Sequence, residues 1–127
     1  MIIGTGIDMV SVPRISRLID RYGERFLRKV FGESEIAEGL RRVDSASFFA
    51  ARFAAREAFF KALGTGWGRG ISLREAGVVR GDKGRPGFVF SDRVKAVLQE
   101  RGIAFCHLSL SHDGGFAQAL VILEGGG

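Results

Sequence analysis

The sequence predicts a mixed fold in which helices and strands pack around one long helix at residues 45–63. Three observations support this prediction. Residues 45–63 contain neither proline nor glycine and are apolar on nearly every side, which is typical of a buried helix. Residues 2–10 alternate in the manner of a strand. Residues 105–111 and 116–123 read as two further strands joined around an Asp-Gly pair, which indicates a hairpin.

The composition is that of an ordinary globular chain with a basic bias. Its 127 residues fit one domain spanning 1–127, with 46% hydrophobic and 26% charged residues. We expect no membrane span and no signal peptide, because no apolar run is long enough and the start lacks a basic region. Cys106 is the only cysteine, so we expect no internal disulfide and a cytoplasmic location. The net charge of +5 and the pI of about 10.1 favour an anionic partner.

The first predicted strand, residues 2–10, places a carboxylate where bulk is absent. Asp8 alternates in phase with Gly4 and Gly6, so a ligand or another segment can approach closely on that face. The alternative is an aspartate at a strand end that caps the following turn.

A run of arginines follows this strand. Ser11 and Pro13 begin a helix that extends to about Tyr22, and Gly23 interrupts it. If the chain stays helical past Gly23, arginines recur on one face beside an apolar strip that contains Leu18: Arg14, Arg17, Arg21, Arg25 and Arg28. On residue types alone, such a run is most simply a solvated basic face.

The central helix carries ionised side chains that an apolar environment does not explain. Asp44 or Ser45 caps its start, and Gly64 supplies the left-handed residue that ends it. Four ionised groups lie toward its middle and end: Arg52, Arg56, Glu57 and Lys61. Glu57 and Lys61 are one helical turn apart. They form either a surface ion pair worth about 0.2–0.5 kcal/mol or part of a ligand site, because buried charges need partners.

The other segments are assigned from turn and capping signals. In chain order they are a link at 29–31, a helix at 34–42, a glycine-rich connector at 64–72, a strand at 73–80, a turn at 81–87, a strand at 88–90 and a helix from Ser91 to about Arg101. The connector is not a phosphate-binding loop of the Walker type, since no Gly-Lys-Ser/Thr follows. His112 sits at the mouth of the C-terminal hairpin.

Three kinds of catalytic site were compared with the residues present. A Cys–His nucleophile would use Cys106 with His107 or His112. Cys106 and His107 are neighbours on one strand and point to opposite faces, and Cys106 beside Leu108 is typical of the core. A zinc site needs three or four His or Cys ligands, and the chain has one cysteine and two histidines in total. A magnesium site is the third possibility. Asp8 and Glu57 would supply carboxylates, and Lys61 a positive charge for a phosphate or a leaving oxygen.

Three stretches resemble the holo-acyl-carrier-protein synthases, the small bacterial-type 4′-phosphopantetheinyl transferases. They are GTGIDMVSVPRI at 4–15, FAAREAFFKALGTG at 53–66 and LSLSH at 108–112. The resemblance extends from residue 2 to about residue 123. It implies an α+β fold, the 4′-phosphopantetheinyl transferase fold, with an antiparallel sheet packed around the long central helix. It also implies transfer of 4′-phosphopantetheine from coenzyme A to a serine of apo acyl carrier protein, with release of 3′,5′-ADP.

The same resemblance implies roles for individual residues. Asp8 and Glu57 would hold Mg²⁺ against the pyrophosphate of coenzyme A, and Lys61 would contact the phosphates and assist the leaving group. Further positions match the nucleotide site: Arg52, Gly64, Gly66, Pro86, Ser111 and His112. Carrier proteins are acidic, so the basic helix would dock them through Arg14, Leu18, Arg21 and Arg25.

The family forms trimers with the coenzyme A site between subunits, and we expect the same assembly here. Two other classes of function are also compatible with parts of the sequence. A small nucleic-acid-binding domain would suit the pI, but the phenylalanines belong to the central helix and do not form a stacking platform on strands. A non-catalytic carrier-binding subunit is disfavoured by the intact Asp8, Glu57 and Lys61. We therefore expect neither nucleic acid nor a membrane as a partner.

Overall fold

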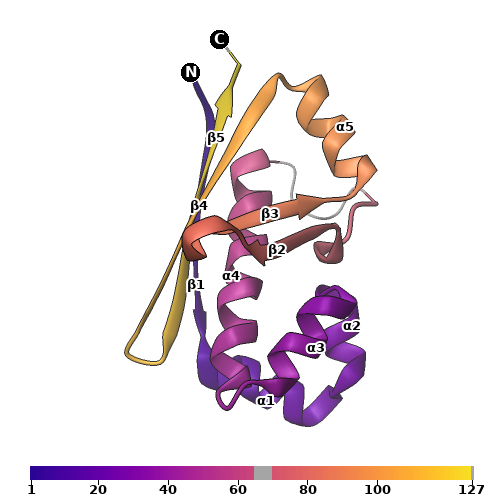
Figure 1. Ribbon diagram of the computed structural model, residues 1–127, viewed down its shortest axis with the longest axis vertical. Coiled ribbons are helices and arrows are strands. Elements are labelled where there is room, and N and C mark those ends of the chain that lie inside the picture. The colour runs from indigo at the N-terminus through magenta and orange to yellow at the C-terminus, as the bar shows by residue number, and fades with distance from the viewer. Residues whose placement is uncertain (65–69, 127) are drawn as a thin grey trace.

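Helix α4 (Ser45–Leu63) is the central element of the computed structural model, which describes residues 1–64 and 70–126 (Figure 1). Both predicted ends are confirmed. The Asp44 carboxylate accepts the Ser47 N–H at 3.1 Å. Gly64 adopts φ 76°, and its N–H donates to the carbonyl oxygens of Phe60 and Lys61. Most side chains of α4 are buried, although its sequence also contains polar and charged residues.

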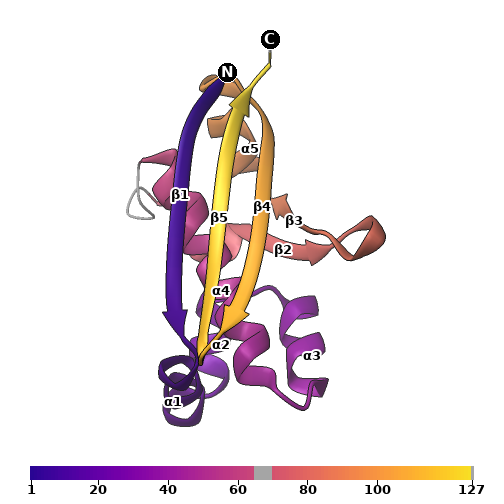
Figure 2. The same ribbon diagram turned by 90° about the vertical axis from the view of Figure 1, so that its left-hand side faces the viewer.

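A three-stranded antiparallel sheet packs along one side of α4. Its strands are β1 (Ile2–Ser11), β4 (Ile103–Asp113) and β5 (Phe116–Gly125), in the order β1-β5-β4. A Cβ added to Gly6 would lie 2.0 Å from the Ala58 carbonyl oxygen, and one added to Gly4 2.2 Å from that of Ala62. The strand therefore lies directly against the helix backbone. Figure 2 shows the three strands from the outside, with α4 behind them.

A two-stranded sheet, β2 (Ala76–Arg80) with β3 (Pro86–Phe90), packs on another side of α4. The ring of Phe59, on α4, lies with its centre 5.2 Å from that of Phe88 and 4.7 Å from that of Phe90. Helix α5 (Asp92–Glu100) follows β3 and leads into β4. The α+β fold and its antiparallel sheet around a central helix are thus confirmed.

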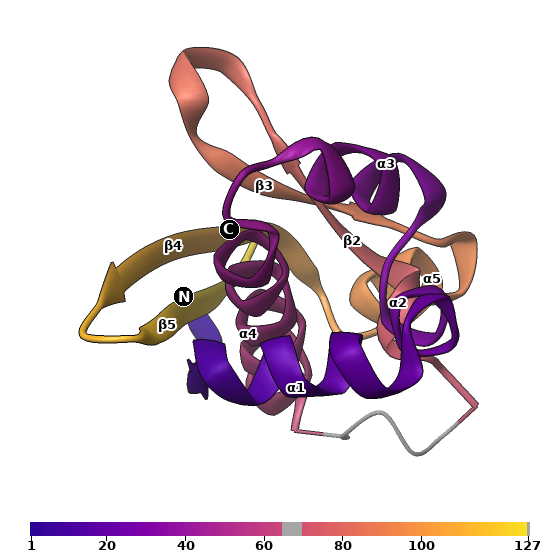
Figure 3. The same cartoon turned by 90° about the horizontal axis from the view of Figure 1, so that it is seen from below.

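Three short helices surround the N-terminal half of α4 (Figure 3): α1 (Val12–Tyr22), α2 (Glu24–Val30) and α3 (Glu33–Arg41). Helix α3 approaches α4 at Gly39, where a Cβ would lie 2.3 Å from the ring of Phe49. Among the described residues, the structure has no helix that combines the length and the apolar character needed to cross a membrane.

Two of the predicted elements are wrong. Residues 29 and 30, predicted as a link, belong to α2, which starts directly after Gly23 and buries Leu27 and Val30. Residues 73–75 form a 3-10 turn (η1, Leu73–Glu75) instead of a strand, because the Glu75 carboxylate accepts the Ser72 N–H at 2.8 Å and closes the turn.

The predicted hairpin and turn are present. Asp113 pairs with Phe116, and the two residues between them, Gly114 and Gly115, both adopt positive φ angles of 57° and 81°. The turn between β2 and β3 contains a second 3-10 segment (η2, Asp82–Gly84), and β3 already begins at Pro86.

Candidate active site

Asp8 and Lys61 meet where β1 runs antiparallel to α4. Asp8 follows Gly4 and Gly6 on the side of β1 that faces the helix, as the alternation predicts. The Lys61 ammonium donates to Asp8 Oδ1 at 2.9 Å and to the Ile7 carbonyl oxygen at 3.1 Å. The Asp8 side chain is 16% exposed and that of Lys61 is 55% exposed, so the lysine reaches in from solvent. Ser11, and not Asp8, caps the helix that follows β1.

Glu57 lies one helical turn before Lys61, on the same side of α4. Its half-buried side chain lines a mainly apolar cavity of about 690 Å³, together with Arg14, Leu18 and Phe53. The Asp8 carboxylate is tied to α4 through Lys61. The chain thus brings acidic groups from two elements, β1 and α4, to one stretch of helix surface.

The donor chemistry at these positions fits magnesium. Carboxylate oxygens are hard ligands, and Mg²⁺ is usually held by one or two carboxylates plus substrate phosphates, not by a cage made entirely of protein. Within residues 1–64 and 70–126, no cluster of three or more His, Cys, Asp or Glu side chains could hold a metal ion. Asp8 and Glu57 could supply two such carboxylates.

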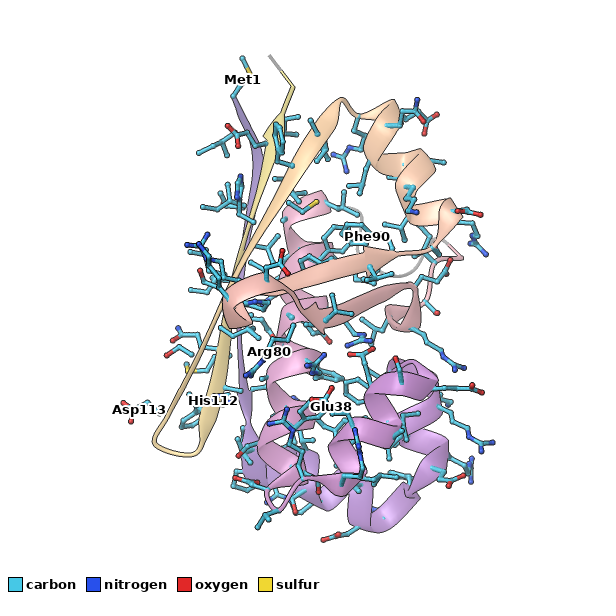
Figure 4. All side chains as sticks on the ribbon, in the orientation of Figure 1. Met1, Glu38, Arg80, Phe90, His112 and Asp113 are labelled. Carbon is cyan, nitrogen blue, oxygen red and sulfur yellow. The ribbon has the colours of Figure 1, made fainter. Side chains whose placement is uncertain are left out.

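A second cavity, of about 520 Å³, opens between α4, β4 and the β2–β3 hairpin. Three of the residues predicted for the nucleotide line it: Arg52, Pro86 and His112. Two arginines that the sequence reasoning missed also line it, Arg42 and Arg80. Figure 4 labels Arg80 at the end of β2 and His112 on β4. Arg80 pairs with Pro86 in the strand register, so the predicted turn could have pointed to it. No motif marks Arg42.

Two of the predicted nucleotide residues, Gly64 and Ser111, do not line this cavity in one chain. Ser111 neighbours His112 on β4 and pairs with Gln118, so it lies on the outer face of the sheet. Gly64 ends α4 twelve residues beyond Arg52, about 18 Å away along the helix axis. Gly66 lies outside the described residues.

The buried arginines of α4 have protein partners. Arg56 is fully buried, and its Nε donates to the Leu73 carbonyl oxygen at 3.0 Å while its Nη1 donates to Glu35 Oε2 at 3.1 Å. Arg52 Nη1 donates to the Val78 carbonyl oxygen and lies 3.5 Å from Glu35 Oε2. Burial lowers the pKa of Arg52, and the charge of Glu35 opposes this effect. Glu35, on α3, was not predicted, because 17 residues separate it from Arg52 in the sequence.

Cys106 is placed as a core residue. Burial raises the pKa of its thiol to about 11, so the reactive thiolate is scarce at neutral pH. His107 points to the outer face of the sheet, where its Nε2 lies 2.9 Å from Glu124 Oε1. Neither residue supports nucleophilic catalysis.

The predicted basic stripe is interrupted. Arg14, Arg17 and Arg21 are exposed on α1, but Gly23 adopts φ 56° and starts a separate helix. Arg25 and Arg28 therefore lie on α2, so the five arginines do not follow one helical face. Arg14 and Leu18 line the same cavity as Glu57. Arg14 of α1 therefore lies near Glu57, one of the two carboxylates predicted to bind the metal ion.

The family model described as the 4′-phosphopantetheinyl transferase superfamily matches residues 4–121. The chain belongs to this superfamily.

The proteins similar to this chain include holo-[acyl-carrier-protein] synthases from several bacteria. The chain is 45% identical over 124 residues to the holo-[acyl-carrier-protein] synthase of Koribacter versatilis, covering 98% of this chain and 99% of the relative. A crystal structure of the synthase from Neisseria meningitidis superposes with a TM-score of 0.91 at 35% identity, covering 98% and 99% of the two chains. The Helicobacter pylori synthase in complex with coenzyme A matches with a TM-score of 0.82 at 32% identity, covering 94% and 99%.

Proposed function

We propose that this chain transfers the 4′-phosphopantetheine group of coenzyme A to a serine of apo acyl carrier protein and releases 3′,5′-ADP. The observation that carries the proposal is the Asp8–Lys61 contact at 2.9 Å, one helical turn from Glu57 and beside a cavity lined by Arg14. The names of the full-length relatives, and coenzyme A in the H. pylori neighbour, support it.

The products define the bonds that change. The serine hydroxyl releases its proton as its oxygen bonds to the phosphorus that carries pantetheine. The bond from this phosphorus to the bridging oxygen breaks, so that 3′,5′-ADP leaves with that oxygen. Asp8 and Glu57 would hold Mg²⁺, which would supply charge neutralisation on the diphosphate. Lys61 donates to Asp8 in the resting site. Its exposed ammonium can turn to donate to the leaving phosphate as negative charge develops there.

The 520 Å³ cavity suits the nucleotide half of coenzyme A. Arg42, Arg52 and Arg80 line it with His112, and guanidinium groups match phosphate oxygens in a planar, two-pronged geometry. Pro86 adds apolar surface of the kind a base packs against. A nucleic-acid-binding role has no comparable support, since the comparisons lead to transferases.

One experiment tests the function directly. The protein is incubated with apo acyl carrier protein, coenzyme A and Mg²⁺, and the carrier is weighed by mass spectrometry. The carrier should gain the mass of one phosphopantetheine group, and a carrier whose acceptor serine is changed to alanine should gain none. A carrier of unchanged mass in the complete mixture would contradict the proposal.

The carrier docks on the exposed face of α1. Arg14 adjoins the Glu57 cavity, and its charge suits the acidic carrier, while Leu18 offers an apolar contact. Removing one partner of such a pair costs about 2–5 kcal/mol when the pair is buried. Arg14→Glu should therefore raise the KM for the carrier at least about tenfold and leave the KM for coenzyme A nearly unchanged. Lys95→Glu, an equal charge reversal on the exposed side of α5, is the matched control. Equal carrier KM values for both variants would place the docking surface elsewhere.

The site is completed by a second copy in a homotrimer. The outer face of the β1-β5-β4 sheet is not covered by any labelled helix in Figure 2, and it exposes large apolar side chains: Ile7 (55%), Met9 (59%), Phe105 (56%) and Leu120 (41%). Ser111 lies on this same face, away from the nucleotide cavity of its own chain. Burying such a face against copies of itself removes apolar surface from water. The number three rests on the resemblance.

Assembly can be measured by light scattering. Wild type should contain three chains, whereas Leu120→Asp should be a folded, inactive monomer, because a carboxylate cannot be buried unpaired in the interface. Val89→Asp, at a 56% exposed position of β3, should still assemble. A fully active wild-type monomer at assay concentration would refute the homotrimer.

The wider setting follows from the proposed partners. Acyl carrier proteins carry fatty-acyl chains, so we assign the protein to fatty acid biosynthesis. The cytoplasmic location rests on the single cysteine and on the need for coenzyme A.

A further inference from the structure

Among the described residues, the buried charged side chains are Glu35, Arg52 and Arg56, which are 6%, 7% and 0% exposed. They form one cluster, in which a single carboxylate faces two guanidinium groups. Buried charges are costly unless they are paired, so an arrangement with one carboxylate for two arginines calls for an explanation.

Arg56 and the start of α3 fix the carboxylate of Glu35. Oε1 accepts the Gly32 N–H at 3.2 Å and a second hydrogen bond from Arg56 Nη2. Oε2 accepts from Arg56 Nη1 at 3.1 Å. Arg56 itself is held by the carbonyl oxygens of Leu73 and Arg52 and by the ring of Phe31, 4.8 Å from its guanidinium carbon. Arg56 is therefore enclosed and cannot reach a ligand.

Arg52 is the member of the cluster that borders the nucleotide cavity. Its guanidinium lies over the ring of Phe48, with 4.2 Å from its carbon to the ring centre, and donates to the Val78 carbonyl oxygen. Glu35 Oε2 lies 3.5 Å from Nη1, and the more distant charge of Glu38 also acts on Arg52. These three contacts hold a planar cation, one helical turn from a second cation, in a single orientation.

We infer that Glu35 is a positioning residue for the nucleotide, acting through Arg52. This inference rests on the proposed function. Without the carboxylate, Arg52 and Arg56 repel each other one turn apart on α4. Arg52 is the one that moves, because it borders the cavity while Arg56 is enclosed. The guanidinium then loses the orientation in which it meets a phosphate group of the nucleotide.

A double-mutant cycle separates this role from a merely structural one. Binding of 3′,5′-ADP is measured by calorimetry for wild type, Glu35→Gln, Arg52→Met and the double variant. Glu35→Gln should weaken binding about tenfold or more, as expected when a charged hydrogen-bonding group is mispositioned. The same change should have no further effect in the Arg52→Met background. In the transfer assay, Glu35→Gln should raise the KM for coenzyme A far more than it lowers kcat.

Two further variants distinguish a specific effect of Glu35 from a general loss of charge and from misfolding. Glu33→Gln removes the same charge from the exposed part of the same first turn of α3 and should bind like wild type. If Glu35→Gln does not fold, Glu35→Asp keeps the charge and shortens the reach. It should weaken binding only where Arg52 is present. Wild-type binding by the folded Glu35 variant, or equal losses with and without Arg52, would overturn the inference. Failure of wild type itself to bind 3′,5′-ADP would instead contradict the proposed nucleotide site.

Discussion

Phosphopantetheine transfer should fall about a thousandfold or more when Asp8 or Glu57 is replaced by alanine, while the protein should stay folded. Each change removes a carboxylate that would hold Mg²⁺ against the diphosphate, and the metal contributes several kcal/mol of transition-state stabilisation. The fold should survive in Asp8→Ala because its partner Lys61 is 55% exposed and can be hydrated instead. Steady-state rates with coenzyme A and carrier protein, together with circular dichroism, measure both parts of this result.

A control variant and the removal of divalent cations make this test more specific. Glu100→Ala removes a carboxylate from the exposed end of α5, far along the chain from the site, and should retain wild-type turnover. Removing divalent cations with a chelator should reduce wild type to the level of the Asp8 variant, and added Mg²⁺ should restore only wild type. Near-wild-type turnover of folded Asp8→Ala or Glu57→Ala would contradict the assignment of these two residues as metal ligands.

Gly6→Ala should destabilise the protein by about 3 kcal/mol or more. The added methyl group would lie 2.0 Å from the Ala58 carbonyl oxygen and 2.8 Å from the Ala62 nitrogen, and both atoms belong to the backbone of α4. Overpacking of this kind costs about 1–3 kcal/mol even where side chains can move, and here β1 itself must shift away from the helix. Asp8, two residues further along β1, would move with it, so activity should fall as well.

Urea denaturation measures this effect. Gly87→Ala is the matched control, because Gly87 also lies in a strand and a Cβ there meets nothing within 4 Å. The control should stay within about 0.5 kcal/mol of wild type, as surface substitutions generally do. If the two alanine variants unfold at the same urea concentration, β1 does not depend on glycine to approach α4.

Local signals explain why the framework could be predicted. The cap at Asp44, the left-handed Gly64 and the apolar surface between them are all written within residues 44–64, and α4 has these ends. The hairpin at Gly114 and Gly115 is equally local. Asp8 could be placed on the helix-facing side of β1 because strand residues alternate and its neighbours on that face are glycines.

The rest depends on contacts between distant segments. Glu35 gives no local sign that it will pair with Arg56, 21 residues away. Gly23 is compatible with a continued helix or a break, and only its φ of 56° shows that the arginines divide between α1 and α2. Ser111 and His112 are adjacent in a matching motif, yet a strand sends them to opposite faces. A motif therefore identified candidates, while the fold decided which of them meet within one chain.

Metal binding can be measured without the transfer reaction, and we expect the metal ion to be held by carboxylates on β1 and α4. Titration of the chelator-treated protein with Mn²⁺ in the presence of coenzyme A can be followed by electron paramagnetic resonance. Wild type should bind one ion per chain, and a folded variant carrying both Asp8→Ala and Glu57→Ala should bind none. Equal binding of Mn²⁺ by wild type and the double variant would show that Asp8 and Glu57 do not hold the metal ion.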